Sequence, residues 1–524
     1  MNVPTTSTEI EVPDAIRTTM NSMLDRIAHK KKKRPLFAKQ TIRIMANTPY
    51  PLKPHQIVGL NRLVEMETKS SMKGGLLCDE PGMGKTIQMG ALMKANQTDS
   101  TLIVVPVCVV NQWTIAMRNI FGKDKVIVHT GSSRPKHWEE LRELRRTNGK
   151  DNLSNIIVIS TYGIVVASKK KKDNLVFENE WGRVILDEGH CIRNKRTKVF
   201  SQLNKIKREH SWILSGTPLQ NRLADIRTLF TFVTPAGVSL PLNCKIQYNM
   251  LRRTKKELER TSSKLDDYKI TNYNCKFQSK EQQEIYMALH RNIMEDLGGE
   301  AAMSLGDVSM EMLEQILRLR QASIHPDLAI HSFCKKYETS VWAKTYTPSA
   351  KINKLIQKVK DTDGYSLVFC HFKAEMDLIQ MELNKAGVDS EIYCGSLNSK
   401  ERAAVLSKFP TESVTKKVLI IQIKAGGVGL NLQQFTSIFI VSPDWNPSNE
   451  IQAIARAHRI GQKKKVEVFK FTTIINEEFL EDEDKQYKIS TIDQMIIKKQ
   501  QFKRLLMAEV LNDVSLEFNE SIEN

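Results

Sequence analysis

The stretch "LLCDEPGMGKTIQ" at residues 76–88 ends like a phosphate-binding loop, a glycine-rich turn that joins a strand to a helix. Residues 74–77 predict a short buried strand, and the residues after the turn have the composition of a helix. Gly82 and Gly84 allow backbone N–H groups to approach phosphate closely. Asp79 stands where this pattern normally has a small residue, so a plain strand-to-helix turn remains the alternative for this stretch alone.

A second stretch, "WGRVILDEGH" at residues 181–190, favours nucleotide hydrolysis. Its apolar run stops at two adjacent carboxylates, as a central parallel strand does where its C-terminal end meets a ligand. Asp187 would hold Mg²⁺ through water, and Glu188 would orient or deprotonate the attacking water. In the loop, Lys85 would meet the phosphates and Thr86 the Mg²⁺. A lone acidic pair is more often a helix cap, but the loop weakens that alternative.

The composition indicates a globular protein with a polyanionic partner. The 524 residues have room for two or three domains, and 41% hydrophobic with 26% charged residues is typical of folded chains. Lysine and arginine number 78 against 59 acidic residues, a net charge of +19. This excess favours nucleic acid over a membrane surface, without choosing between DNA and RNA.

The eight cysteines are scattered without a CxxC pair, which argues against a zinc site or a disulfide framework and favours a reducing compartment. The N-terminus lacks the apolar core of a secretory signal. The longest apolar run, residues 102–110, contains a proline and is too short to cross a bilayer. We expect a soluble intracellular protein with no membrane partner and no metal other than Mg²⁺.

Apolar strand-like runs alternate with helix-length segments twice along the chain, which predicts the α/β class with doubly wound parallel sheets. Between the two halves, glutamine, glutamate, methionine and leucine recur at helical spacing. The expected organisation is a basic N-terminal segment at 1–48, a first α/β lobe at 49–235, a mainly helical insertion and linker at 236–346, a second α/β lobe at 347–490, and a C-terminal helical tail at 491–524.

Two lysine runs have open interpretations. "HKKKKRPLFAK" at residues 29–39 is either a nuclear-import signal or basic arm, or a solvated charge run. "ASKKKKD" at residues 167–173 is either an exposed loop or a DNA contact.

An ordered series of motifs resembles the superfamily-two helicase-like ATPases and, within them, the Swi/Snf family of double-stranded-DNA translocases. The resemblance runs from about residue 50 to residue 490. It implies two recA-like lobes that bind ATP, and it makes an aspartate at position 79 expected. The series is similar to the branch with ring-finger repair translocases and a transcription-termination ATPase, but the ring's cysteines are missing, so ubiquitin-ligase activity is not expected. The motifs are "LKPHQIVGL" (52–60), "DEPGMGKTIQ" (79–88), "LIVVPVCVVNQW" (102–113), "VISTYG" (158–163), "VILDEGHCIRN" (184–194), "LSGTPLQN" (214–221), "LRRTKKEL" (251–258), "LVFCHF" (367–372), "IKAGGVGLNL" (423–432), "DWNP" (444–447) and "QAIARAHRIGQ" (452–462).

The resemblance assigns roles at the nucleotide. It implies that Gln56 reads the adenine edge and that Gln452, Arg456 and Arg459 come from the second lobe to the γ-phosphate. An arginine on a separate domain would make hydrolysis depend on lobe closure. The catalytic set is therefore Lys85, Asp187, Glu188, Arg456 and Arg459, and the nucleotide-binding set is Gln56, Asp79, Gly82, Gly84, Lys85, Thr86 and Gln452. Pro81, Met83 and Gly189 depart from the family pattern without removing a catalytic group.

The resemblance also implies contacts with DNA. Gly426 and Gly427 would turn backbone N–H groups toward a phosphate, Lys424 would lie on the DNA strand, and Trp445 would look into the groove. Ser215 and Thr217 would relay hydrolysis to the DNA-binding surface. A core position for the tryptophan, and a turn with a helix cap for the serine and threonine, are the alternatives.

The function expected from the resemblance is an ATP- and Mg²⁺-dependent translocase on duplex DNA that remodels or strips protein–DNA complexes in transcription, repair, chromatin or viral DNA metabolism. The rivals are a strand-separating helicase, an RNA-dependent ATPase, and a nucleotide-switched clamp without processive turnover. We expect a monomeric ATPase core, protein partners for targeting, and a nuclear location, or a cytoplasmic or virion location for a viral protein.

Overall fold

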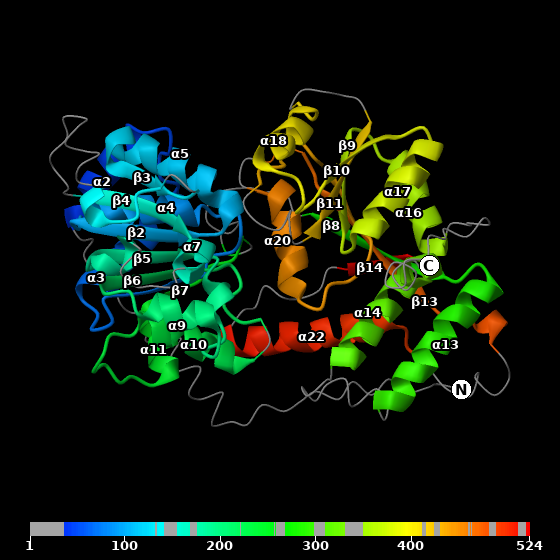
Figure 1. Cartoon of the computed structure of the whole chain (residues 1–524). Helices are drawn as coiled ribbons and strands as arrows, with labels where there is room; N and C mark the ends of the chain where they lie inside the picture. Colours follow the sequence, from blue (N-terminus) through cyan, green and yellow to red (C-terminus); the bar gives the residue numbers. More distant parts are fainter. Residues whose placement is uncertain are drawn as a thin grey trace, which may run out of the picture.

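The computed structural model describes residues 36–131, 134–140, 155–167, 175–220, 222–255, 257, 268–297, 310–330, 349–410, 416–423, 430–459, 462, 464–480, 489–511 and 520–523. Two parallel sheets, each covered by helices, lie side by side as two lobes (Figure 1). This confirms the predicted α/β class with two parallel-sheet lobes.

The first sheet has seven parallel strands in the order β3-β4-β2-β5-β6-β1-β7. Alternate residues of its strands enter two different core clusters: Leu102 and Val104 lie in one, Ile103 and Val105 in the other. The sheet is therefore buried on both faces, which is why its strands are continuous apolar runs. The strands are β1 (Gly74–Leu77), β2 (Ser100–Val105), β3 (Val126–His129), β4 (Ile156–Thr161), β5 (Trp181–Asp187), β6 (Arg208–Leu214) and β7 (Met250–Leu251).

Helices cover both faces of this sheet. Those packed in the core cluster of Ile103 are α2 (Leu36–Ala46), α3 (Pro54–Thr68), α4 (Lys85–Ala95) and α5 (Val110–Phe121). Those packed in the cluster of Leu102 are α7 (Tyr162–Ala167), α8 (Leu175–Glu178), α9 (Lys198–Asn204), α10 (Leu223–Val233) and α11 (Leu242–Asn249).

The second sheet is built in the same way, with seven parallel strands in the order β10-β11-β9-β12-β13-β8-β14. Its strands are β8 (Lys269–Lys276), β9 (Tyr365–Cys370), β10 (Asp389–Tyr393), β11 (Lys417–Gln422), β12 (Ser437–Ile440), β13 (Glu467–Ile474) and β14 (Glu520–Glu523). Its helices are α16 (Ala350–Asp361), α17 (Lys373–Lys385), α18 (Ser399–Ser407) and α20 (Pro447–Ala457).

The range expected to be a helical insertion, 236–346, also contains strands. Strand β7 pairs with β1 and extends the first sheet, whereas β8 pairs with β13 and belongs to the second. Strand β8 reads "KITNYNCK" and buries only alternate residues, so polar side chains conceal its strand character in the sequence. Likewise, the tail ends in β14, which pairs with β8.

The predicted helices of the insertion and tail are present as α13 (Lys280–Leu297), α14 (Met310–Ile324) and α22 (Ile492–Leu511). Figure 1 shows α22 passing below both lobes. Its first turns, with Ile492 and Ile496, pack in the cluster of α13 and α14, whereas Met507 reaches the core of the first lobe. Among the helices that the structure describes, none is long and apolar enough to span a membrane.

A buried ion pair ties α3 to the centre of the first sheet. Arg183 donates to Glu67 through Nε at 2.6 Å and through Nη2 at 2.7 Å. Trp212 Nε1 donates to the same carboxylate at 2.8 Å. Burial opposes ionisation of Glu67, but the adjacent Arg183 outweighs it and lowers the pKa of the carboxyl.

Replacing Glu67 with alanine would leave the Arg183 guanidinium buried without its carboxylate. We expect Glu67→Ala to lower the free energy of unfolding of the first lobe by about 3–5 kcal/mol. Glu65→Ala, which removes an exposed partner of Arg62 and Lys69, is the matched control and should cost at most about 1 kcal/mol. Urea unfolding followed by tryptophan fluorescence measures both, and equal losses in the two variants would contradict the prediction.

Candidate active site at the lobe interface

The predicted phosphate-binding loop lies between β1 and α4, at the C-terminal edge of the first sheet. Gly82 and Gly84 have left-handed backbone angles, with φ of 89° and 82°. A Cβ added at Gly84 would lie 2.3 Å from Nε2 of Gln56, so the second glycine is required by space as well as by conformation. The loop thus leads directly into the N-terminus of α4, whose free N–H groups favour an anion.

Lys85 begins α4 and points back into the loop. Its ammonium group donates to the carbonyl oxygens of Asp79 at 2.8 Å and Glu80 at 3.4 Å. Thr86 follows in the first turn of the helix. The lysine charge is therefore inside the loop where the phosphates are predicted to bind.

Asp79 supports the loop from behind. Its side chain is fully buried. Both of its oxygens pair with Arg253, and one of these bonds is donated by Arg253 Nε at 3.0 Å. The carboxylate also accepts a hydrogen bond from Gln88 Nε2 at 2.9 Å. These contacts give the carboxylate a structural role in the loop, and its predicted contact with nucleotide stays a prediction.

Gln56 is also tied to the loop. Its Nε2 donates to the Met83 carbonyl at 3.2 Å, and its Oε1 accepts from the Lys53 amide at 3.0 Å. His55 contacts the same carbonyl at 3.1 Å. Recognition of adenine by Gln56 stays a prediction, but the glutamine is positioned to couple α3 to the loop.

The two predicted catalytic carboxylates follow β5. Asp187 accepts from Trp113 Nε1 at 2.6 Å and from the Glu188 amide at 3.0 Å. Tyr162 donates to the Asp187 carbonyl oxygen at 2.7 Å. Glu188 has a left-handed backbone, with φ of 50°, and its carboxylate lies 3.3 Å from His190 Nδ1. The two carboxylates are thus held at the strand end by different partners.

Their environments shift the two pKa values in opposite directions. Burial, followed by the charge of Glu188, raises the pKa of Asp187. Burial also opposes ionisation of Glu188, but the hydrogen bond with His190 and the cations Lys85 and Arg456 outweigh it and lower its pKa. Glu188 therefore stays ionised throughout the pH range in which Asp187 titrates, as a base or water-orienting group requires.

Gly189 replaces the alanine of the family pattern, and packing explains it. A Cβ at this position would lie 2.5 Å from Cγ2 of Ile213 on the neighbouring strand β6. The glycine makes room for a larger core residue beside it.

The second lobe completes the site from across the interface. Gln452 on α20 donates through Nε2 to Glu188 Oε2 at 3.5 Å. Arg459 lies just after this helix and against Gly82: a Cβ built on the glycine would be 3.5 Å from Cγ of the arginine. The structure thus brings the predicted arginine to the predicted phosphate loop.

The two arginines form a pair of like charges, of which Arg456 is buried and Arg459 partly buried. Burial lowers the pKa of Arg456, and burial together with the charge of Arg456 lowers the pKa of Arg459 to about 10. Among the described residues, Arg459 Nε has no hydrogen-bond partner. Both side chains remain cationic at neutral pH, so they favour an anion between the lobes.

A hydrogen-bonded chain leads from Glu188 toward the "SGTP" turn. His190 Nδ1, which contacts Glu188, also lies 3.4 Å from Ser215 Oγ. The Thr217 amide donates to that same hydroxyl at 3.2 Å. The relay predicted for Ser215 and Thr217 therefore has a physical path to the catalytic carboxylate, although its function stays a prediction.

The predicted DNA contacts are placed only in part. Lys424, Gly426 and Gly427 lie outside the described residues, as does most of the lysine run at 167–173. Trp445 is half-buried in the cluster of α13, α14 and α22, its carbonyl accepts from Lys503 Nζ at 2.7 Å, and Lys499 lies over its ring. Its surroundings are those of the core alternative.

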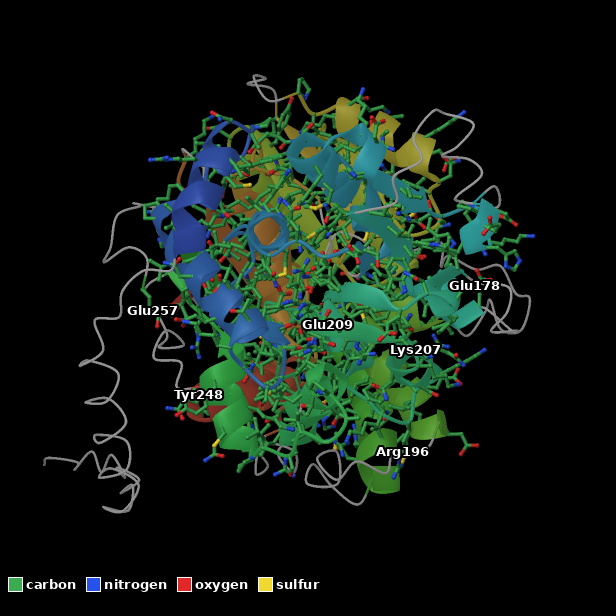
Figure 2. All side chains as sticks on the ribbon, turned by 90° about the vertical axis from the view of Figure 1, so that its left-hand side faces the viewer. Glu178, Arg196, Lys207, Glu209, Tyr248 and Glu257 are labelled. Carbon is green, nitrogen blue, oxygen red and sulfur yellow. The ribbon has the colours of Figure 1, made fainter. Side chains whose placement is uncertain are left out.

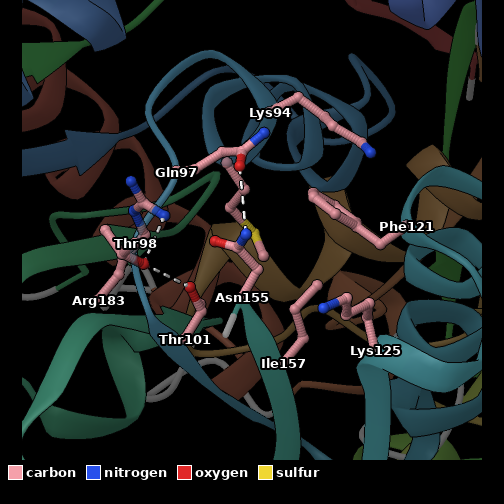
Figure 3. A pocket seen from close by; sticks show the side chains of 10 residues that line it. Lys94, Gln97, Thr98, Thr101, Phe121, Lys125, Asn155, Ile157 and Arg183 are labelled. Carbon is pink, nitrogen blue, oxygen red and sulfur yellow. Dashed lines mark hydrogen bonds between the residues drawn. The ribbon is translucent and has the colours of Figure 1, made fainter. Parts of the chain in front are cut away.

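A cavity of about 100 Å³ elsewhere in the first lobe is not part of this site (Figure 3). It lies at the N-terminal ends of the strands, beside Thr101, Ile157 and Arg183. Asn155 and Gln97 bond to each other across it at 3.2 Å. Ligands in such sheets bind at the C-terminal ends, where the loop and the carboxylates meet.

The donor set fits a phosphate-bound Mg²⁺. Each carboxylate oxygen of Asp187 accepts one of these hydrogen bonds and keeps a lone pair for metal-bound water. Within the described ranges, no group of three or more His, Cys, Asp or Glu could hold a metal. Thr86, Asp187, waters and phosphate oxygens suit Mg²⁺, which rarely uses an all-protein cage.

Trp113, Arg253 and Lys255 lie within the sequence motifs, but the sequence predicts no role for them. The structure places all three at the site: Trp113 on Asp187, Arg253 on Asp79, and Lys255 on the second lobe at His458. Their partners are 74, 174 and 203 residues away, so no local pattern reveals the contacts.

The fold and site define a two-lobed, helicase-like nucleotide hydrolase. Residues 55–240 match the SNF2-related domain, and residues 350–461 match the helicase conserved C-terminal domain. The chain belongs to the Swi/Snf family of helicase-like ATPases. Enzymes of this family are DNA-dependent ATPases, and this chain carries both halves of their nucleotide-binding core.

Relatives extend from viruses to yeast. The probable global transactivator of Orgyia pseudotsugata multicapsid polyhedrosis virus is 29% identical over 81% of this chain and 86% of its own length. The putative ATP-dependent helicase/translocase YwqA of Bacillus subtilis is 27% identical over 80% of this chain and 46% of its own length. Nuclear protein STH1/NPS1 of Saccharomyces cerevisiae is 25% identical over 85% of this chain. The chain spans only 34% of that yeast protein.

Among solved structures, the Sulfolobus solfataricus SWI2/SNF2 ATPase core in complex with dsDNA is 22% identical and covers 90% of this chain and 98% of its own, with a TM-score of 0.37.

The opposite pKa shifts predict that Asp187 sets the acid limit of hydrolysis. Its raised pKa means that activity is present above that pKa and is lost as the pH falls through it, whereas Glu188 remains ionised. Because Mg²⁺ binds the ionised form, higher Mg²⁺ concentrations should move the acid limb to lower pH. The profile of kcat/KM against pH at several Mg²⁺ concentrations measures this. An acid limb that does not move with Mg²⁺ would show that another group controls it.

Proposed function

We propose that the protein is an ATP-dependent translocase on double-stranded DNA that remodels or strips protein–DNA complexes. The observation that carries the proposal is the composite site: Gln452 contacts Glu188 across the lobes, and Arg459 packs on Gly82. A site divided in this way can hydrolyse ATP only when the lobes close, which couples chemistry to a movement of one lobe on the other.

In the proposed cycle, the phosphates of ATP replace the Asp79 and Glu80 carbonyls as partners of Lys85. Ionised Glu188 orients or deprotonates the water, and Arg456 and Arg459 neutralise the charge that develops on the γ-phosphate. Thr86, and Asp187 through water, would hold Mg²⁺, which would add further charge neutralisation. Release of the products reopens the lobes.

Charge supports a nucleic-acid track. The net charge of +19 favours a polyanion. Figure 2 views the first lobe from the side away from the second, where the exposed Glu178, Arg196, Lys207 and Glu209 mix both signs. The proposal places the duplex on the side where the lobes face each other. The proposal includes a monomeric ATPase core and protein partners that target it.

The relatives give the proposal two possible settings. One is named a nuclear protein and another a viral global transactivator. We propose nuclear DNA as the site of action, or viral DNA in an infected cell. Strand separation, RNA-dependent hydrolysis and a clamp that does not turn over are the rivals that the following experiment distinguishes.

ATP hydrolysis should be stimulated by duplex DNA more than by single-stranded DNA or RNA, and the protein should displace a third strand from a triplex in an ATP-dependent manner. Glu188→Gln should lower kcat about 10²–10⁴-fold because the base is lost. Greater stimulation by RNA would establish the RNA-dependent enzyme. Unwinding of a plain duplex would indicate a helicase, and turnover no faster than Glu188→Gln would indicate a clamp.

A further inference from the structure

The segment "RRTK" at residues 252–255 runs beside the phosphate loop. The Cys78 amide donates to the Leu251 carbonyl at 2.7 Å, and the Glu80 amide donates to the Arg253 carbonyl at 3.1 Å. These bonds continue the pairing of β7 with β1 past the ends of both strands. The segment is therefore built on the backbone of the loop.

Its arginines join the loop to two other motifs. Arg252 donates through Nη1 to the carbonyls of Cys78 at 3.2 Å and Gly216 at 3.3 Å, which links β1 to the "SGTP" turn. Arg253 holds Asp79 and donates to Gln88 Oε1 at 2.8 Å, which links the loop to α4. Both contacts remain within the first lobe.

Lys255 differs because its side chain reaches the second lobe. Its amide donates to Glu80 Oε2 at 2.9 Å, so its backbone is fixed to the phosphate loop. Its ammonium group donates to the carbonyl oxygen of His458 at 2.7 Å and lies 3.2 Å from Nδ1 of that residue. His458 caps the C-terminus of α20 and is almost fully buried.

The contact lies at the C-terminal end of α20, directly before Arg459. A cation is favoured at a helix C-terminus, where the last carbonyls lack partners within the helix. The Arg456 carbonyl already accepts from the Leu432 amide at 3.1 Å. The Ala457 carbonyl accepts from the Arg459 amide at 3.1 Å. The carbonyl that follows, that of His458, is the one that Lys255 binds.

We propose that Lys255 is a positioning residue that caps α20 across the lobe interface and thereby sets Arg459 against the phosphate loop. The inference rests on the proposed function. When the lobes separate, the contact between Lys255 and His458 is lost and Arg459 is no longer held against the phosphate loop. When the lobes close, Lys255 connects the loop to the end of α20. Nothing in the sequence pattern of "LRRTKKEL" assigns this role to the lysine.

The test uses Lys255→Met, with Lys255→Arg as the conservative variant and Lys69→Met as a control for loss of an exposed lysine charge. At saturating ATP and duplex DNA, Lys255→Met should lower kcat between about 10- and 100-fold, with the affinity for ATP unchanged, because the arginine is displaced while the loop is intact. Lys255→Arg should recover most of the rate, and Lys69→Met should match the wild type.

A double-mutant cycle separates positioning from a general structural effect. In an Arg459→Ala background, Lys255→Met should reduce single-turnover hydrolysis no further, because the group that it positions is absent. Equal fold losses in the two backgrounds, or a kcat of Lys255→Met equal to that of the wild type, would overturn the proposal.

Hydrogen exchange distinguishes failure of this inference from failure of the proposed function. Lys255→Met should speed exchange of the amides in the last turn of α20, around His458 and Arg459, and Lys69→Met should not. Unchanged exchange there would overturn the role of Lys255 whatever the turnover. Faster exchange in a protein that DNA fails to stimulate would uphold the contact and reject the translocase.

Discussion

The ion pair between Asp79 and Arg253 underlies the nucleotide site. A buried carboxylate must be paired, and removing one partner of such a pair costs several kcal/mol. Here the partner comes from a segment 174 residues further along the chain, where β7 has just completed the edge of the first sheet. The phosphate loop therefore acquires its shape only when the whole first lobe has folded, and the segment that shapes it leads on toward the second lobe.

The need to pair charges also operates between the lobes. Asp187 and Glu188 are neighbouring carboxylates on one lobe, and the buried Arg456 and the partly buried Arg459 are neighbouring cations on the other. The two carboxylates repel each other, and so do the two arginines, whereas carboxylates and arginines attract. The negative charge of ATP beside the arginines would reduce their mutual repulsion when the lobes close. In an open cleft, solvent alone would screen that repulsion. This arrangement makes lobe closure and hydrolysis interdependent, which a translocating motor requires.

Much of this architecture could be predicted from the sequence, because fully buried parallel strands such as β2 and β9 read as continuous apolar runs. Strand β8 could not be predicted, because the polar residues that alternate along it are also typical of a connecting segment. At the site, local patterns predicted roles for Lys85, Asp187 and Glu188. They could not show that Asp79 faces Arg253, or that Gly189 makes room for Ile213, because those reasons lie in distant segments.

We propose that the second lobe supplies the charge that completes a site already able to bind ATP. The most direct test compares Arg459→Ala with Lys85→Ala, measuring equilibrium binding of a fluorescent ATP analogue and turnover with saturating duplex DNA. We predict that Arg459→Ala binds the analogue like the wild type but loses about 10³-fold or more in kcat, whereas Lys85→Ala loses binding. Turnover of Arg459→Ala near the wild-type rate would contradict the account.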